Sequence, residues 1–87
     1  MVQVNLGNVY RELPSGDRAD NLQQAIICYQ EALCSQTAEA APLNYALIQN
    51  NLGLVYSELG TTGGLEEAIT CFHEALRFWT PEVAPLD

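Results

Sequence analysis

Apolar residues recur along this chain with the spacing of amphipathic helices. In four separate segments they stand three or four positions apart, which gathers them on one face of a helix. The four stripes are Leu6, Val9, Tyr10 and Leu13; Leu22, Ala25, Ile26, Tyr29, Ala32 and Leu33; Leu52, Val55, Tyr56 and Leu59; and Leu65, Ala68, Ile69, Phe72, Ala75 and Leu76. The pattern predicts an all-α fold with helices over residues 1–13, 20–35, 44–59 and 64–79.

Turn-forming residues separate the four stripes. Proline and glycine cluster in PSGD at 14–17 and in GTTGG at 60–64, and a proline precedes a polar residue in AAPLN at 40–44. A polar or small residue ahead of a helix commonly caps its first N–H groups, and a glutamine or glutamate three positions later strengthens the signal. The expected N-caps of the second, third and fourth helices are Asp20, Asn44 and Gly63.

The second half of the chain repeats the first. NLGNVY at 5–10 returns as NLGLVY at 51–56, LQQAIICYQEAL at 22–33 as LEEAITCFHEAL at 65–76, and TAEAAPLN at 37–44 as TPEVAPLD at 80–87. Self-similarity at a fixed period is the signature of repeat architectures. A chain of 87 residues is long enough for one small domain. We therefore expect a single domain over 1–87, made of a first repeat (1–43) and a second repeat (44–87).

Small and aromatic residues predict how the helices pair. Gly7 and Gly53 lie inside predicted helices, where glycine costs about 1 kcal/mol relative to alanine. The close approach of a neighbouring helix would account for such a glycine. Large residues would then fill the remaining space: Tyr10, Tyr29, Tyr56 and Phe72. The pattern predicts an antiparallel helix hairpin in each repeat.

These residues resemble the tetratricopeptide repeat (TPR), whose pattern is W-x2-L-G-x2-Y, then A-x3-F, then a later proline. The matching segments are L-G-x2-Y at 6–10 and 52–56, A-x3-Y-x2-A at 25–32, A-x3-F-x2-A at 68–75, and the closing proline at Pro81, with Pro42 and Pro85 as further candidates. Gln3 and Gln49 replace the consensus tryptophan. The repeat offsets, 43 to 46 residues, exceed the usual 34, as in the long repeats of kinesin light chains and of bacterial arrays attached to caspase-like peptidase domains.

The resemblance implies two hairpins of a right-handed α-solenoid that serves as a protein–protein interaction scaffold. In this family the first helix of each hairpin lines a concave groove that holds an extended peptide or a partner helix. The positions that would face the groove are Asn5, Asn8 and Glu12, with Leu47, Asn51, Leu54 and Glu58. The mismatch between Asn8 and Leu54 falls on this face, where two copies can differ without disturbing the shared fold.

Asn5 and Asn51 stand at equivalent groove positions. A carboxamide both donates and accepts hydrogen bonds, so it can grip the backbone of a bound peptide. The other interpretation is that both are polar surface residues or hydrogen-bond an adjacent helix. The basic clamp that some family members use is absent, because the only basic residues are Arg11, Arg18 and Arg77. Its absence argues against an acidic peptide tail as the ligand.

The net charge and the cysteine content limit which classes of partner and which cellular compartment fit this chain. Eleven Asp and Glu against three Lys and Arg give a net charge of -8, which argues against nucleic acid and anionic membranes. Cys28, Cys34 and Cys71 are odd in number and lack CxxC spacing, which fits a reducing cytoplasm. No apolar run reaches the length of about 18 residues that spans a membrane, and no secretion signal opens the chain. We expect a soluble cytoplasmic protein.

The sequence offers no convincing set of catalytic residues. Cys71 and His73 stand two positions apart on a predicted helix, where side chains point in different directions. They fit a small buried hydrophobe and a solvent-facing histidine better than a catalytic dyad. Glu66 and Glu67 fit helix-start charge. We therefore expect no enzyme, no metal site and no cofactor.

The two ends of the chain suggest a second class of function. The chain begins and ends at the same point of the repeat. This is the pattern expected of two repeats from a longer array that lacks its polar capping repeats. Phe78 and Trp79 add apolar bulk near one end. These features predict a homo-oligomer, formed by head-to-tail stacking or by exchange of a hairpin through the link at 36–43. Alternatively, Trp79 packs against its own hairpin.

Overall fold

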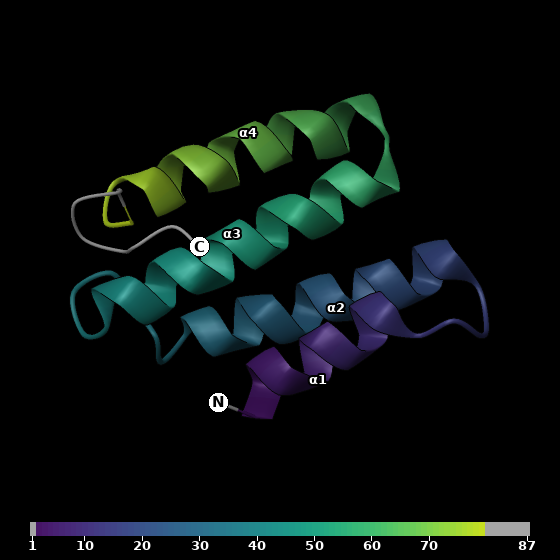
Figure 1. The fold of residues 1–87 in the computed structure, drawn as a ribbon, viewed down its shortest axis with the longest axis horizontal. Helices are drawn as coiled ribbons and strands as arrows, with labels where there is room; N and C mark the ends of the chain where they lie inside the picture. The colour runs from purple at the N-terminus through teal and green to yellow at the C-terminus, as the bar shows by residue number, and fades with distance from the viewer. Residues whose placement is uncertain (1, 80–87) are drawn as a thin grey trace.

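A computed structural model describes residues 2–79 of the chain (Figure 1). These residues form four helices: α1 (Val2–Glu12), α2 (Arg18–Leu33), α3 (Pro42–Leu59) and α4 (Thr62–Leu76). The predicted all-α class is confirmed for this part of the chain. Met1, Pro81 and Pro85 lie outside the described residues. The predicted boundary between the repeats, after residue 43, falls in the first turn of α3.

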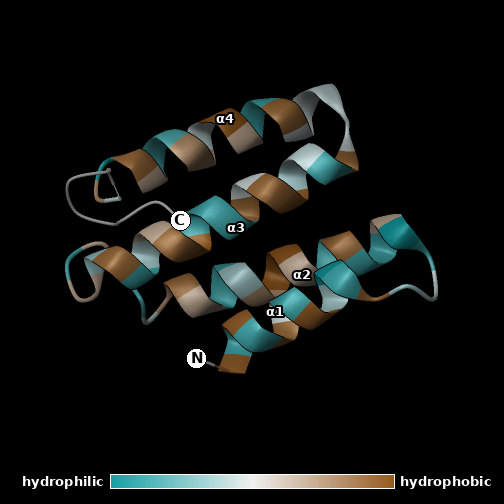
Figure 2. Cartoon of the chain, viewed as in Figure 1, coloured by the Kyte–Doolittle hydropathy of each residue, from teal (hydrophilic) through white to brown (hydrophobic). Residues whose placement is uncertain are grey.

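Each helix packs against the next one in chain order (Figure 1). α1 contacts α2, α2 contacts α3 and α3 contacts α4. Figure 2 shows hydrophobic and hydrophilic residues intermixed along each helix. One core cluster draws on every helix: Val4, Leu22, Ala25, Ile26, Tyr29, Ala32, Ile48, Leu52, Val55 and Cys71. Among residues 2–79, no helix has both the length and the apolar character needed to cross a membrane.

The helices start at different residues from those predicted. α2 begins after Asp17, whose carboxylate accepts a hydrogen bond from the Asp20 N–H at 3.0 Å. α4 begins after Thr61, whose hydroxyl accepts from the Gly64 N–H at 2.9 Å. α3 begins at Pro42, whose fixed φ suits the first helical position. The expected caps at Asp20, Asn44 and Gly63 are therefore wrong.

α2, α3 and α4 each begin two residues earlier than predicted, because every residue added to a helix makes one more backbone hydrogen bond. Asn44 consequently lies inside α3, where its amide donates to Gln36 Oε1 at 2.9 Å. α2 and α4 also end two and three residues earlier than predicted, at Leu33 and Leu76. α3 ends where predicted, and Gly60 follows it with a φ of 73°, a left-handed conformation that glycine adopts without strain.

The predicted close approach at two helical glycines is present, and aromatic rings make it. A Cβ on Gly7 would lie 2.7 Å from Tyr29 Cε1, and a Cβ on Gly53 would lie 2.6 Å from Phe72 Cε1. Both distances are shorter than a carbon–carbon contact allows. Rings of α2 and α4 therefore lie directly on the backbones of α1 and α3.

Equivalent apolar residues of the two repeats are buried to different degrees. Leu52 and Val55 of α3 are 3% and 0% exposed, whereas their equivalents in α1, Leu6 and Val9, are 46% and 57% exposed. The apolar pattern alone would place Leu6 in the core beside its equivalent Leu52, and the structure shows that this is wrong; Leu65, Ile69 and Leu76 are exposed as well. α2 and α3 cover one another's large apolar residues, whereas Leu6, Val9, Leu65, Ile69 and Leu76 lie on sides of α1 and α4 that stay exposed.

Candidate functional site

The predicted groove residues lie on two helices that are not consecutive in the chain. Asn5, Asn8 and Glu12 stand three and four positions apart on α1, so they share one face of that helix. The α3 residues follow the same spacing: Leu47, Asn51, Leu54 and Glu58. Asn5, Glu12 and Glu58 are exposed, and the other four residues are half-buried.

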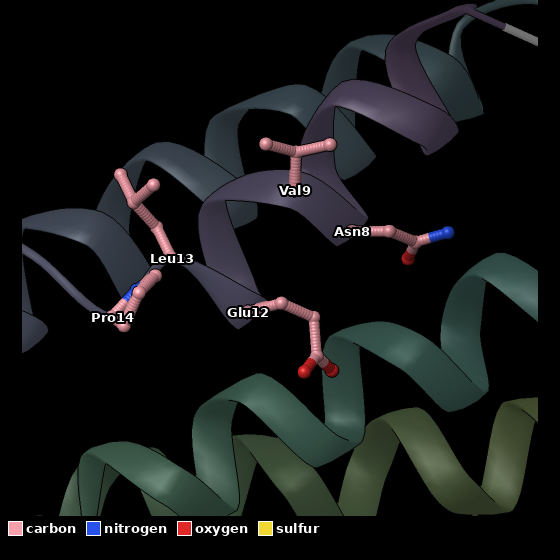
Figure 3. Close-up of a pocket in the computed structure, with 5 residues that line it drawn as sticks. All are labelled: Asn8, Val9, Glu12, Leu13 and Pro14. Carbon is pink, nitrogen blue, oxygen red and sulfur yellow. The ribbon is translucent and has the colours of Figure 1, made fainter.

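The C-terminal end of α1 borders a shallow, open hollow. Its lining residues are Asn8, Val9, Glu12, Leu13 and Pro14. Figure 3 shows the Glu12 side chain extending toward α3, with Asn8 on the same side of α1, whereas Val9 and Leu13 point away from α3. Two polar groups thus occupy the side of α1 that faces α3, and an apolar stripe occupies another side.

An ion-pair cluster joins the end of α3 to the end of α1 and the start of α2. Arg11 Nε donates to Glu58 Oε1 at 3.0 Å, and an Arg18 guanidinium nitrogen donates to Glu58 Oε2 at 2.5 Å. Arg18 also donates to the Arg11 carbonyl oxygen. Partial burial alone would lower the pKa of Arg11, but the hydrogen bond and charge of Glu58 outweigh burial and raise that pKa. Both carboxylate oxygens of Glu58 are therefore engaged within the chain.

Glu12 is the equivalent of Glu58 in the first repeat, since YREL at 10–13 matches YSEL at 56–59. Unlike Glu58, it forms no ion pair within residues 2–79. The third basic residue, Arg77, pairs with Glu74 at 2.9 Å. The structure therefore distinguishes two glutamates that the sequence pattern treats alike, and it leaves Glu12 as the acidic group beside the hollow.

Asn8 is committed to a hydrogen bond inside the fold. Its amide oxygen accepts from the hydroxyl of Tyr29, whose side chain is fully buried. Burial raises the pKa of that phenol, which keeps the proton that it donates. In the second repeat Leu54 replaces Asn8 and Phe72 replaces Tyr29, so donor and acceptor are absent together. The mismatch inside NLGNVY and NLGLVY is thus coupled to the core and is not free to vary alone.

The hydrogen bond between Asn8 and Tyr29 escaped sequence reasoning because it joins residues on different helices. The sequence did carry one signal of this bond. Between the two repeats, Asn8 changes to Leu54 and Tyr29 changes to Phe72, so a polar residue is lost from both helices of the pair at once. Asn5 and Asn51 behave differently: within residues 2–79 neither amide hydrogen-bonds another side chain or the backbone of another element. Asn5 is exposed and Asn51 is half-buried.

A double-mutant cycle tests the coupling of Asn8 to Tyr29. Tyr29→Phe is expected to lower the free energy of unfolding by about 1 kcal/mol, because it removes one hydrogen bond. Asn8→Leu is expected to cost about 1–2 kcal/mol, because it leaves a buried hydroxyl unpaired. The double variant reproduces the Leu54 and Phe72 pair, so we expect its stability in urea to return to within about 0.5 kcal/mol of the parent. Losses that simply add would contradict the coupling.

Phe78 and Trp79, the residues proposed for self-association, follow α4 and are half-buried. The Phe78 ring meets Tyr45 edge to face, with centroids 5.8 Å apart, and the Arg77 guanidinium lies 4.9 Å from the Phe78 centroid. Tyr45 donates its hydroxyl proton to Glu74 at 2.5 Å, which lowers the pKa of that carboxyl. Phe78 therefore packs within its own chain.

Cys71 and His73, the two residues considered for catalysis, differ in their exposure to solvent. Cys71 is buried, and burial raises the pKa of its thiol to about 11, so at neutral pH it lacks the thiolate that a nucleophile needs. His73 is exposed on the same helix. Cys28 is buried as well, and Cys34 is exposed. Within residues 2–79, no three His, Cys, Asp or Glu side chains lie close enough together to hold a metal ion.

Comparison with known proteins leaves the internal repeat as the main guide to this chain. No family model, no curated protein and no solved structure matches it.

Proposed function

We propose that this chain is a protein–protein interaction module of the TPR type. Its four helices would form two antiparallel hairpins of a right-handed α-solenoid, and its groove along α1 and α3 would bind an extended peptide or a partner helix. The observation that carries the proposal is the side of α1 that faces α3, along which the Glu12 side chain extends (Figure 3). The function proposed is binding and not catalysis.

The charges along the groove favour a ligand with basic side chains. All three arginines are engaged in ion pairs inside the chain. Glu12 has no such partner among residues 2–79, and the chain carries a net charge of -8. A lysine or arginine of the ligand would meet Glu12, whereas an acidic tail would be repelled. Asn5 and Asn51 would hydrogen-bond the ligand backbone.

Selection from a displayed library of random peptides tests the groove. We expect the 87-residue chain to enrich peptides with at least one Lys or Arg. Calorimetry with the enriched peptides should show binding that weakens about tenfold or more in the Asn5→Ala/Asn51→Ala double variant, because each lost hydrogen bond is worth about 1 kcal/mol. Glu12→Gln should weaken basic peptides selectively.

The matched control is Gln24→Ala, which removes an exposed carboxamide from α2, away from the groove. It should leave peptide affinity unchanged. A selection that enriches no peptide over the double variant would overturn the groove as a binding site, as would equal losses in the control and in the groove variants.

A further inference from the structure

α1 exposes an apolar stripe whose equivalent in α3 is buried. We call this the head stripe: Val2, Leu6 and Val9, which are 76%, 46% and 57% exposed. The residues 46 positions later are Ile48, Leu52 and Val55, all of them in the core. The two stripes have nearly the same composition, so the difference in burial comes from their surroundings. α3 has α2 against its stripe.

α4 shows the same difference at the other end of the described helices. We call its exposed apolar residues the tail stripe: Leu65, Ile69 and Leu76. Their equivalents 43 positions earlier are Leu22, Ile26 and Leu33, which are identical in type and lie in or against the core. Ile69 is 59% exposed and Ile26 is 5% exposed.

The chain already contains the contact that would bury both stripes. Leu22 and Ile26 of α2 share one buried cluster with Leu52 and Val55 of α3. The tail stripe reproduces the α2 side of this contact, and the head stripe reproduces the α3 side, with Val2 in place of Ile48. The tail stripe is therefore complementary to the head stripe in the way that α2 is complementary to α3.

We propose that the head and tail stripes bind one another between copies of this chain, so that α4 of one copy packs on α1 of the next in the geometry of α2 on α3. A head-to-tail contact of this kind is heterologous and leaves a free stripe at each end, so it builds open chains of copies. The contact does not rest on the proposed groove, because Asn5 and Asn51 belong to neither stripe.

The contact between copies is weaker than its internal counterpart. Inside the chain Arg11 reaches across to Glu58, but the residue equivalent to Arg11 is Ser57, so Glu12 of the next copy would meet a serine. Each copy also carries a net charge of -8, and the repulsion between copies is screened by salt. Association therefore strengthens as sodium chloride is added.

Sedimentation velocity of the 87-residue chain tests the proposal. Between about 10 µM and about 1 mM protein, the range of weak association, we expect the average mass to rise above the monomer mass of 9.5 kDa, and to rise further with salt. A chain that stays at 9.5 kDa throughout overturns the proposal.

Two single variants test which surfaces meet. Leu6→Asp destroys the head stripe and leaves the tail stripe intact, and Ile69→Asp does the reverse. Each variant alone should stay monomeric, whereas an equimolar mixture should form a 1:1 pair and nothing larger. Self-association of either variant alone would indicate a symmetric contact or an exchanged hairpin and would overturn the proposal. A mixture that stays monomeric would overturn it too.

Ile27→Asp is the matched control, because Ile27 is exposed on α2 outside both stripes. It should associate as the parent does, and loss of association in this variant would overturn the proposal. Circular dichroism checks that each variant is folded. If an Asp variant loses its helical signal, Leu6→Ser and Ile69→Ser replace the pair, with the same expected outcomes. The Asn5→Ala/Asn51→Ala variant should associate as the parent does. A negative result for peptide binding in the groove can therefore be told apart from a negative result for association through the stripes.

Discussion

Leu22→Ala is expected to destabilise this protein by about 3 kcal/mol, whereas Leu65→Ala is expected to cost less than about 1 kcal/mol. The two leucines occupy equivalent positions of the two repeats, in LQQA and LEEA. Leu22 is 1% exposed and belongs to the core cluster, so its truncation leaves a cavity between packed helices. Leu65 is 46% exposed, so its truncation removes only partial burial.

Urea denaturation followed by circular dichroism measures both changes, at low micromolar protein so that copies do not cover the tail stripe. A domain of this size is stable by only about 5–10 kcal/mol, so Leu22→Ala should remove a large part of that stability and shift the urea midpoint clearly. Equal losses at Leu22 and Leu65 would contradict the unequal burial of the two repeats, on which the head-to-tail contact depends.

Gly7→Ala is expected to lower the free energy of unfolding by about 1–2 kcal/mol, although alanine is the better helix former by about 1 kcal/mol. The added methyl group would lie 2.7 Å from Cε1 of Tyr29. That ring cannot move aside easily, because it is fully buried and its hydroxyl is bonded to Asn8. The steric cost therefore exceeds the gain in helix propensity.

Gly63→Ala is the matched control for the glycine in α1. Gly63 also lies in a helix, but a Cβ there would meet no atom within 4 Å. With no clash, the same change should be neutral or should stabilise the protein by about 0.5 kcal/mol. Thermal and urea denaturation of both variants decide the point. A stabilising Gly7→Ala would show that Tyr29 does not restrict the backbone of α1.

The proposed groove and the two stripes use different sides of the same helix. On α1, Glu12 extends toward α3, whereas Val9 of the head stripe points away from it (Figure 3). A copy that packed on the head stripe would bring its Ser57 near Glu12, but a serine forms no ion pair with that carboxylate, so Glu12 would keep its charge for a ligand. Head-to-tail association would therefore extend the groove from one copy to the next, and a long peptide could contact several copies at once.

The candidate groove was only partly predictable from the sequence. Periodicity places Asn5, Asn8 and Glu12 on one face of α1, and that much follows from helix geometry. Periodicity does not reveal that Asn8 accepts a hydrogen bond from Tyr29 or that Glu58 is held by two arginines. These interactions join different helices, so they depend on how the helices pack.

The sequence by itself determined the helices and the positions, Gly7 and Gly53, at which a neighbour comes close. Apolar spacing placed each helix to within a few residues, since a stripe on one face needs only helical geometry. A close approach at Gly7 could also be anticipated, since a glycine inside a helix demands a reason, but that the Tyr29 ring makes it is seen only in the structure. The tertiary structure alone decided which of two nearly identical stripes is buried. Burial depends on the neighbouring helix and not on the residues of the stripe, so Leu52 lies in the core and Leu6 lies on the surface.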